Sequence, residues 1–301
     1  MKLASFITSG RSSYGAVLGD GVVDIGARLG ARYPDLRSLL AAEDGLELAR
    51  EWASASADTG AEDLRYLPVI PNPGKIYCIG VNYADHLQET KISRAAHPTV
   101  FMRCAQSQVG HLERMLLPPE AKQFDFEGEV ALVMGRGGRR IAPERAWDHI
   151  AGYACYNDGS MRDWQFQTTQ WTAGKNYAQT GAFGPWMTTA DELDLRSRPL
   201  TLTTRLNGEV MQHSDTSMLI FSIPEIIAYC SAFLPLDAGD VIVTGTPGGV
   251  GMARTPQLFM QPGDVLEVEV SGIGTLRNTI RAESSKAESS RDPSGRSVPI
   301  A

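Results

Sequence analysis

Cysteine is scarce in this sequence, and its spacing excludes two classes of site. The chain of 301 residues holds four cysteines, and none of them forms a Cys-x-x-Cys pair: Cys78, Cys104, Cys155 and Cys230. Neither a cysteine zinc site nor a redox-active dithiol is therefore expected. Each cysteine is expected instead to be a small buried hydrophobic side chain.

Long apolar runs and an excess of positive charge are also missing. No run approaches the roughly 18 apolar residues of a membrane-spanning helix, and the N-terminal residues lack the apolar stretch of a secretory signal. The 35 acidic residues outnumber the 28 Lys and Arg residues, which gives a formal net charge of −7 without any basic cluster. We therefore expect a cytoplasmic protein that acts on a small molecule and binds neither nucleic acid nor membrane.

Two glycine-rich segments lack the signatures of nucleotide sites. Residues 245–251 have no Gly-Lys-Ser/Thr of a phosphate loop, and residues 135–138 have neither the spacing nor the following helix of a dinucleotide site. Glycine allows close approach of the backbone to a bound ligand. The segment around Thr246 is therefore expected to contact a substrate.

Proline and composition divide the chain into three expected parts. Pro68, Pro71 and Pro73 separate a small N-terminal α+β domain, residues 1–70, from a larger domain, residues 71–281. Residues 282–301 contain Ser, Arg, Glu and Pro with almost no aliphatic residues, and are expected to be a disordered tail. The expected fold class is α+β, mostly β.

The residue patterns predict many short strands and few helices. Strands are expected over residues 2–8, 15–25, 240–244 and 264–270, and helices over residues 36–53, 143–149 and 224–232. Asn207-Gly208 separates two strand-like runs, residues 200–206 and 209–213. This dipeptide favours a hairpin with a type I′ turn.

Three acidic residues carry the strongest chemical signal. Glu127 and Glu129 lie two apart in a strand-like run, residues 124–133, and Asp158 ends a later run. Residues i and i+2 of a strand face the same way, with Cα atoms about 6.6 Å apart. Two buried carboxylates at this short separation repel each other unless a cation neutralises them. This all-oxygen set suits Mg²⁺, Mn²⁺ or Ca²⁺. The alternative is a solvated Glu-x-Glu face without a metal.

His86 and Glu89 form a second pair, in a segment that has the pattern of a helix start. Residues i and i+3 lie on one helix face, and a carboxylate beside an imidazole fixes its tautomer and supports its protonated form. Such a pair can take a proton from water near neutral pH. The alternative is a surface histidine that has a glutamate nearby by chance.

Further motifs follow in a recognisable order along the chain. They are Asp-Gly-Ser-Met-Arg-Asp-Trp-Gln from Asp158, Ala-Gly-Lys-Asn-Tyr around Lys175, and Thr-Gly-Thr-Pro from Thr244. With the two constellations above, they make the chain resemble the fumarylacetoacetate hydrolase family, and more closely its acylpyruvate hydrolase branch, from about Pro71 to Ile280. The resemblance implies a catalytic domain built as a mixed β-sheet roll, and a homodimer.

The resemblance also implies roles for individual residues. It implies Mg²⁺ or Mn²⁺ on the three carboxylates, with His86, oriented by Glu89, as the general base and Lys175 stabilising an enolate. Arg162 and Gln165 would hold a substrate carboxylate or keto oxygen, and the segment with Thr246 would contact substrate. The alternatives are a solvated loop lysine at position 175, a structural ion pair for the arginine and a surface amide for the glutamine.

The reaction that the resemblance implies is hydrolysis of a C–C bond in a 2,4-dioxo acid of the acylpyruvate or fumarylpyruvate type. Hydroxymuconate isomerisation and oxaloacetate decarboxylation use the same kind of metal-enolate site, but only hydrolysis needs an activated water, so His86 favours a hydrolase. A non-catalytic binding protein would need a gap in the ligand set, and none is found. Five aromatic residues allow a bulkier acyl group: Trp164, Phe166, Trp171, Phe183 and Trp186.

Overall fold

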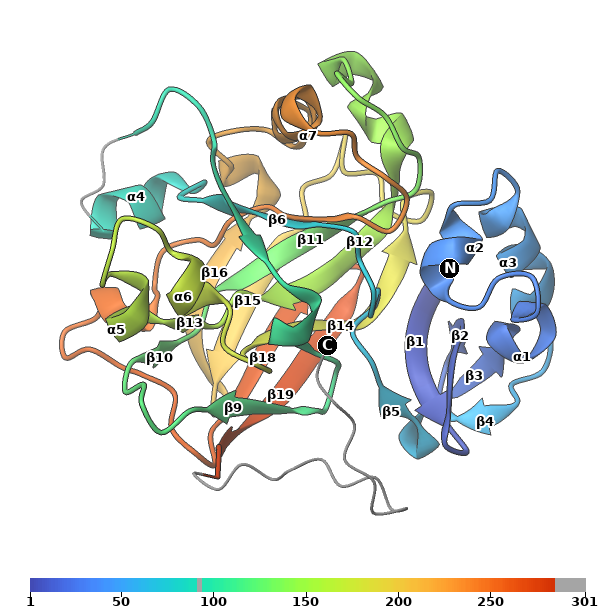
Figure 1. Cartoon of the computed structure of the whole chain (residues 1–301), viewed down its shortest axis with the longest axis horizontal. Coiled ribbons are helices and arrows are strands. Elements are labelled where there is room, and N and C mark those ends of the chain that lie inside the picture. The colour runs from blue at the N-terminus through green and yellow to red at the C-terminus, as the bar shows by residue number, and fades with distance from the viewer. Residues whose placement is uncertain (91–93, 285–301) are drawn as a thin grey trace, which may run out of the picture.

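Two large sheets, one short strand pair and several short helices make up the chain, which a computed structural model describes over residues 1–90 and 94–284 (Figure 1). The α+β, mostly β fold class is confirmed. The expected tail lies outside the described residues except for residues 282–284. No described helix is long and apolar enough to cross a membrane.

The N-terminal part of the chain, blue in Figure 1, combines short strands with three α-helices and one 3₁₀ helix. The predicted strand over residues 2–8 is confirmed, and the run over residues 15–25 contains two strands joined through Gly19, which has φ 59°. The elements are β1 (Lys2–Thr8), β2 (Arg11–Leu18), β3 (Gly21–Asp24), α1 (Ile25–Leu29), α2 (Leu36–Leu40), α3 (Gly45–Ala53), β4 (Thr59–Gly60), η1 (Ala61–Asp63) and β5 (Arg65–Tyr66).

The single helix expected over residues 36–53 is wrong, because α2 and α3 are separated by a tight turn. The backbone N–H of Gly45 donates to Ala42, and a Cβ at Gly45 would lie 1.9 Å from the carbonyl oxygen of Leu39. The apolar spacing continues through this turn. It therefore does not reveal where the first helix ends.

The larger sheet runs through both parts of the chain. Its strand order is β4-β3-β2-β1-β14-β12-β11-β17-β6-β7, and β5 and β8 pair with β1 and β14. Strand β1 joins β14 antiparallel, with Leu3 opposite Met187, so the N-terminal strands extend the sheet of the larger part. The further strands of this sheet are β6 (Ile76–Gly80), β7 (Thr99–Arg103), β8 (Gln108–Val109), β11 (Gly128–Met134), β12 (Ile150–Asn157), β14 (Gly181–Thr189) and β17 (Val241–Val243).

The second large sheet has the order β16-β15-β18-β19-β9. It contains the predicted hairpin, in which Asn207 and Gly208 have φ 53° and 84°, as a type I′ turn requires. Strands β10 and β13 form a separate pair. The bounds are β9 (Arg114–Leu117), β15 (Thr201–Leu206), β16 (Glu209–Asp215), β18 (Val265–Val270), β19 (Gly274–Ala282), β10 (Phe124–Asp125) and β13 (Ser160–Met161).

The remaining helices are short, and α7 is the longest of those described. Both helices expected to start with proline are present, although the one at Pro143 is a 3₁₀ helix. The bounds are α4 (Ala84–Thr90), η2 (Ala105–Ser107), η3 (Pro143–His149), α5 (Arg162–Gln165), α6 (Thr172–Lys175), η4 (Thr216–Met218), α7 (Ile223–Phe233) and η5 (Gly251–Ala253).

Strand β11 is buried on both faces, because it separates two cores. Leu132 packs in a core shared with the five-stranded sheet, whereas Ala131 and Val133 pack in a core shared with the N-terminal helices. Alternation along the strand puts Glu129 on the same face as Ala131 and Val133. A fully buried strand therefore carries the glutamate into the interior of the molecule.

The continuous strand expected over residues 124–133 is wrong, because the chain changes partners within it. Strand β10 pairs with β13, whereas β11 pairs with β12 from Gly128 opposite Asn157. Phe126 and Glu127 lie between the two strands. The break places Glu127 beside the end of β12, where Asp158 follows.

Candidate active site

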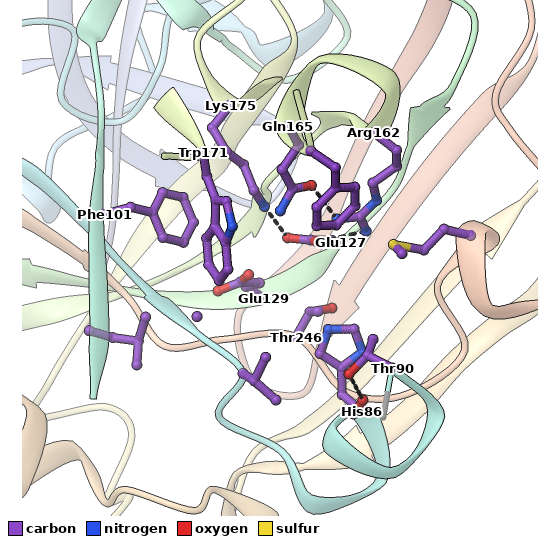
Figure 2. A pocket seen from close by; sticks show the side chains of 15 residues that line it. His86, Thr90, Phe101, Glu127, Glu129, Arg162, Gln165, Trp171, Lys175 and Thr246 are labelled. Atoms are coloured by element: carbon purple, nitrogen blue, oxygen red, sulfur yellow. Dashed lines mark hydrogen bonds and ion pairs between the residues drawn. The ribbon is translucent and has the colours of Figure 1, made fainter. Parts of the chain in front are cut away.

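A cavity of about 350 Å³ opens beside the carboxyl ends of β6 and β17 (Figure 2). Seven of the nine site residues predicted from the sequence line it, and the other two, Glu89 and Asp158, contact residues that do. The lining residues are Ile79, Gly80, Val81, His86, Thr90, Phe101, Glu127, Glu129, Arg162, Gln165, Phe166, Trp171, Lys175, Thr246 and Met252.

The three predicted ligand carboxylates meet at one wall of this cavity. One side-chain oxygen each of Glu127, Glu129 and Asp158 lie within 4.8 Å of one another, and all three residues are buried. The backbone explains the approach, because the N–H of Asp158 donates to the carbonyl of Glu127 over 2.9 Å. The solvated Glu-x-Glu face is therefore excluded.

Two of these carboxylates have cationic partners. The Nζ atom of Lys175 lies 2.7 Å from Oδ2 of Asp158 and 2.6 Å from Oε2 of Glu127. Arg162 Nη2 lies 2.7 Å from Oε1 of Glu127, and Figure 2 shows these two contacts of Glu127. Arg103 forms a buried ion pair with Asp158. Burial would raise the pKa of Glu127, but Lys175 and Arg162 outweigh it and lower that pKa to about 2.

Glu129 has no such partner. Among residues 1–90 and 94–284, no lysine or arginine forms an ion pair with it, and it accepts one hydrogen bond, from the backbone N–H of Gly245, over 2.5 Å. Burial, and then the charges of Asp158 and Glu127, raise its pKa well above the ordinary value. A site with this excess of buried negative charge and an all-oxygen donor set fits a hard divalent cation such as Mg²⁺ or Mn²⁺.

The predicted histidine–glutamate pair forms on α4. The buried ring of His86 contacts Glu89 through Nδ1, which lies 2.7 Å from Oε1. The other carboxylate oxygen accepts the backbone N–H of Gly249 over 2.8 Å. Because Nδ1 is bound to the carboxylate, Nε2 is the nitrogen that remains for a ligand or water in the cavity that His86 lines. The chance surface pair is excluded, since the histidine is buried.

Three buried or partly buried carboxylates hold the loop that follows β17 and the start of η5. Gly245 donates to Glu129, Gly249 donates to Glu89, and the N–H groups of Gly251 and Met252 both donate to Asp125. The loop thus connects the carboxylate cluster to the histidine pair.

The glycines of this loop approach the protein itself, whereas the sequence suggested approach to a ligand. Gly245 has φ 105° and Gly249 has φ 103°, and a Cβ on Gly249 would lie 2.2 Å from the carbonyl oxygen of Met211. Thr246 is the loop residue that lines the cavity between them. Its hydroxyl donates to the carbonyl of Gly128 over 3.0 Å and accepts from Gln212 over 2.8 Å.

Arg162 and Gln165 belong to α5 and act together. Arg162 donates through Nε to Asp125 over 2.9 Å and through Nη1 to Oε1 of Gln165 over 2.8 Å. The amide of Gln165 therefore keeps its two N–H donors for an oxygen in the cavity. Burial would lower the pKa of Arg162, but Glu127 and Asp125 outweigh it and raise that pKa.

Sequence reasoning missed several residues that support the site. Asp125 lies next to the acidic run and could have been noticed there, since it is fully buried and binds Arg162. Arg103, on β7, and Gln212, on β16, carry no local signal, yet they bind Asp158 and the N–H of Gly128. Phe101, which lines the cavity from β7, was also missed.

The five aromatic residues expected to shape the substrate pocket do not gather there. Phe166 and Trp171 line the cavity. Trp164 packs against Tyr177, Phe183 packs against Tyr156, and the indole N–H of Trp186 donates to the carbonyl of Ile273. Proximity in sequence therefore does not bring these side chains together at the cavity. Phe183, for example, lies on strand β14 and packs in a core.

Comparison with known proteins finds relatives over most of the chain. Residues 75–281 match the sequence model of the fumarylacetoacetate hydrolase C-terminal family. The mitochondrial oxaloacetate tautomerase Fahd2a of Rattus norvegicus is 34% identical over 266 residues, which cover 87% of this chain and 85% of that protein.

Solved structures share the fold as well. The maleylpyruvate hydrolase of Sphingobium sp. SYK-6, in complex with manganese(II) and pyruvate, superposes with a TM-score of 0.78 at 28% identity, covering 94% of this chain and all of that one. The 5-carboxymethyl-2-hydroxymuconate delta-isomerase of Mycobacterium smegmatis gives a TM-score of 0.74 at 29% identity, with the same coverage.

Proposed function

Because this chain belongs to the fumarylacetoacetate hydrolase family, we propose that it is a divalent-metal-dependent hydrolase that cleaves the C3–C4 bond of a 2,4-dioxo acid. The products are pyruvate and a carboxylic acid. One observation carries the proposal: His86, which is bound to Glu89, lines the same cavity as the buried carboxylates Glu127 and Glu129.

The proposed substrate lies with its carboxylate end at the carboxylate cluster. A bound Mg²⁺ or Mn²⁺ would act there as a Lewis acid toward the oxygens at C1 and C2. Lys175 uses two of its three N–H donors on Glu127 and Asp158, which leaves one for the C2 oxygen. Gln165 donates to a second substrate oxygen, while Arg162 keeps Glu127 in place.

His86 supplies the water chemistry in this scheme. Its Nε2 takes a proton from water, which attacks the C4 carbonyl, and Glu89 stabilises the imidazolium that forms. The C3–C4 bond breaks, and the electron pair moves toward C2 as an enolate whose charge Lys175 meets. Protonation of C3 by solvent completes pyruvate, and the imidazolium of His86 releases its proton to solvent.

A second function is favoured by a specific observation, the 34% identity to an oxaloacetate tautomerase over 87% of this chain. Tautomerisation needs the enolate-stabilising residues, Lys175 and the carboxylates, but no attack by water. An isomerase acting on a hydroxymuconate would have the same requirement. The proposed hydrolase differs from both in its dependence on His86.

The test separates cleavage from enolisation in one variant. His86→Ala should lower the cleavage of acetylpyruvate by about 10²–10⁴-fold, the usual contribution of a positioned general base. Proton exchange at C3, followed by NMR in D₂O, should fall much less because Lys175 remains. His149→Ala, which changes a histidine bound to the carbonyl of Arg136, is the matched control.

Two results would argue for the tautomerase or isomerase instead. One is unchanged cleavage in His86→Ala, and the other is an equal loss of cleavage and exchange. Acetylpyruvate, fumarylpyruvate and oxaloacetate are compared side by side with the unaltered protein. The homodimer and the cytoplasmic location are further proposals, which size-exclusion chromatography with light scattering and cell fractionation can check.

A further inference from the structure

We propose that the substrate of this site is a monoanion whose end remote from the carboxylate is an alkyl or aryl group. This inference rests on the proposed function and deepens it by naming the class of substrate. It follows from how charge and apolar surface are divided within the cavity.

One side of the cavity is an apolar wall built by two strands and the residue before α6. Phe101 and Trp171 pack edge to face, with ring centroids 5.4 Å apart and planes at 71° (Figure 2). Ile79, near the end of β6, and Val81, which follows the strand, line the same cavity. A wall of this composition favours burial of an alkyl chain or an aromatic ring.

Gly80 makes room for this wall. A Cβ at Gly80 would lie 2.4 Å from Cζ3 of Trp171 and 2.9 Å from its neighbour Cη2. The indole can lie against β6 only because residue 80 has no side chain. The position of Trp171, and with it the width of the apolar part, therefore depends on a glycine in the strand.

The cations of the cavity are committed to its carboxylates. Lys175 Nζ also lies 4.9 Å from the centroid of the Phe101 ring, at the border between the apolar wall and the carboxylate cluster. Among the described residues that line it, the lysine and arginine side chains are Lys175 and Arg162, and both already form ion pairs with Glu127. Each also binds a second carboxylate, Asp158 or Asp125. One substrate carboxylate is accommodated at the carboxylate cluster by the proposed function.

A second substrate carboxylate would meet the aromatic wall without an uncommitted cation, because Lys175, which borders Phe101, already pairs with Glu127 and Asp158. Burying an unpaired carboxylate is strongly unfavourable, because the desolvation is not compensated. Oxaloacetate and fumarylpyruvate carry such a second carboxylate, whereas acylpyruvates with alkyl or aryl groups do not. The cavity volume of about 350 Å³ is at the low end for small-molecule sites, which suits a short alkyl chain or a single ring.

The first experiment measures binding without turnover. The full-length protein with Mg²⁺ is titrated calorimetrically with 2-oxopentanoate and with 2-oxoglutarate, which differ in a terminal methyl group against a carboxylate. We expect 2-oxopentanoate to bind at least about tenfold more tightly, and 2-oxohexanoate about threefold to fourfold more tightly again for its extra methylene. Equal or tighter binding of 2-oxoglutarate would overturn the inference.

The second experiment locates the preference at the aromatic wall. In the unaltered protein, kcat/KM for hexanoylpyruvate should exceed that for fumarylpyruvate, with acetylpyruvate as the common reference. Trp171→Ala should lower the ratio of kcat/KM for hexanoylpyruvate over acetylpyruvate by about tenfold. Trp52→Ala, which changes a tryptophan that packs against Arg28 on the N-terminal part, should leave that ratio as it is.

The outcomes distinguish the two levels of the argument. If acetylpyruvate is not cleaved, the proposed function fails, while the calorimetric preference still tests the apolar wall. If acetylpyruvate is cleaved but fumarylpyruvate is the better substrate, or Trp171→Ala keeps the ratio unchanged, the inference fails and the proposed function stands.

Discussion

The partners of each side chain distinguish the three carboxylates of the site. Glu127 and Asp158 are neutralised by lysine and arginine, whereas Glu129 is buried with only a backbone N–H as partner. Lys175 lies between two of the carboxylates and is itself buried, so the solvated loop lysine is excluded. The arginine and the glutamine are likewise buried, which excludes the surface amide for Gln165.

Glu129→Gln tests the metal that the proposed function requires. Glutamine keeps an oxygen that can accept the N–H of Gly245, but it removes the unpaired charge that favours a divalent ion. We expect the affinity for Mn²⁺, measured by calorimetry, to fall by at least about 100-fold. This loss is larger than the loss of affinity expected when a residue that only supports a metal ligand is removed. Glu47→Gln, which changes an exposed residue on α3, is the control. Equal Mn²⁺ affinities in the unaltered protein and both variants would rule out a metal site at Glu129.

His111 provides a pH prediction away from the site. Burial, and then the charge of Arg277, lower its pKa to about 4 from the ordinary 6.5, and the backbone N–H of Arg277 donates to its Nδ1, which must be unprotonated. Between these pH values the unfolded chain binds more protons than the folded one. The contribution of this residue is therefore complete above pH 6.5 and is lost as the pH falls toward 4, by up to about 3 kcal/mol.

The variant His111→Gln should weaken this dependence. Glutamine can accept the same N–H but does not titrate in this range. Urea unfolding at pH 7 and at pH 4.5 should show a larger loss of unfolding free energy for the unaltered protein than for the variant. Equal losses would show that the imidazole does not cause the dependence.

The short elements of the chain position the site through their ends. Helix α4 presents His86 and Glu89 on one face, and α5 and α6 begin or end at Arg162 and Lys175. The break between β10 and β11 brings Glu127 to the end of β12. Each of these elements is too short to be stable alone, so tertiary packing holds it in place.

Across the whole molecule, one sheet crosses the boundary expected near residue 70. The core that contains Leu3, Tyr14 and Leu36 also contains Ala131 and Val241, from the centre of the sheet. The N-terminal part and the larger part therefore share both backbone hydrogen bonds and buried apolar side chains. We expect them to unfold together.

Leu3→Ala tests this coupling. The side chain is fully buried, so its truncation should lower the unfolding free energy by about 2–5 kcal/mol and shift a single calorimetric transition to lower temperature. Leu18→Ala, at an exposed leucine on β2, should cause a much smaller shift. Two separate transitions, with only one of them moved, would contradict the shared core.

The sequence by itself determined features that depend on neighbouring residues. The Asn207-Gly208 turn, the helix with Pro224 in its first turn and the pairing of His86 with Glu89 all follow from local conformational rules, and each is present. The acidic pattern also singled out the three carboxylates, and the family resemblance added Lys175. The structure gathers these residues at one cavity.

Only the tertiary structure decided which distant residues complete the site. Arg103 reaches Asp158 across 55 positions, Gln212 reaches Gly128 across 84, and Gly249 reaches Glu89 across 160. Phe101 and Trp171 come together on a cavity wall in the same way. No local pattern marks these residues, because strand pairing between distant segments sets their contacts, and that pairing depends on how the whole chain buries its apolar surface.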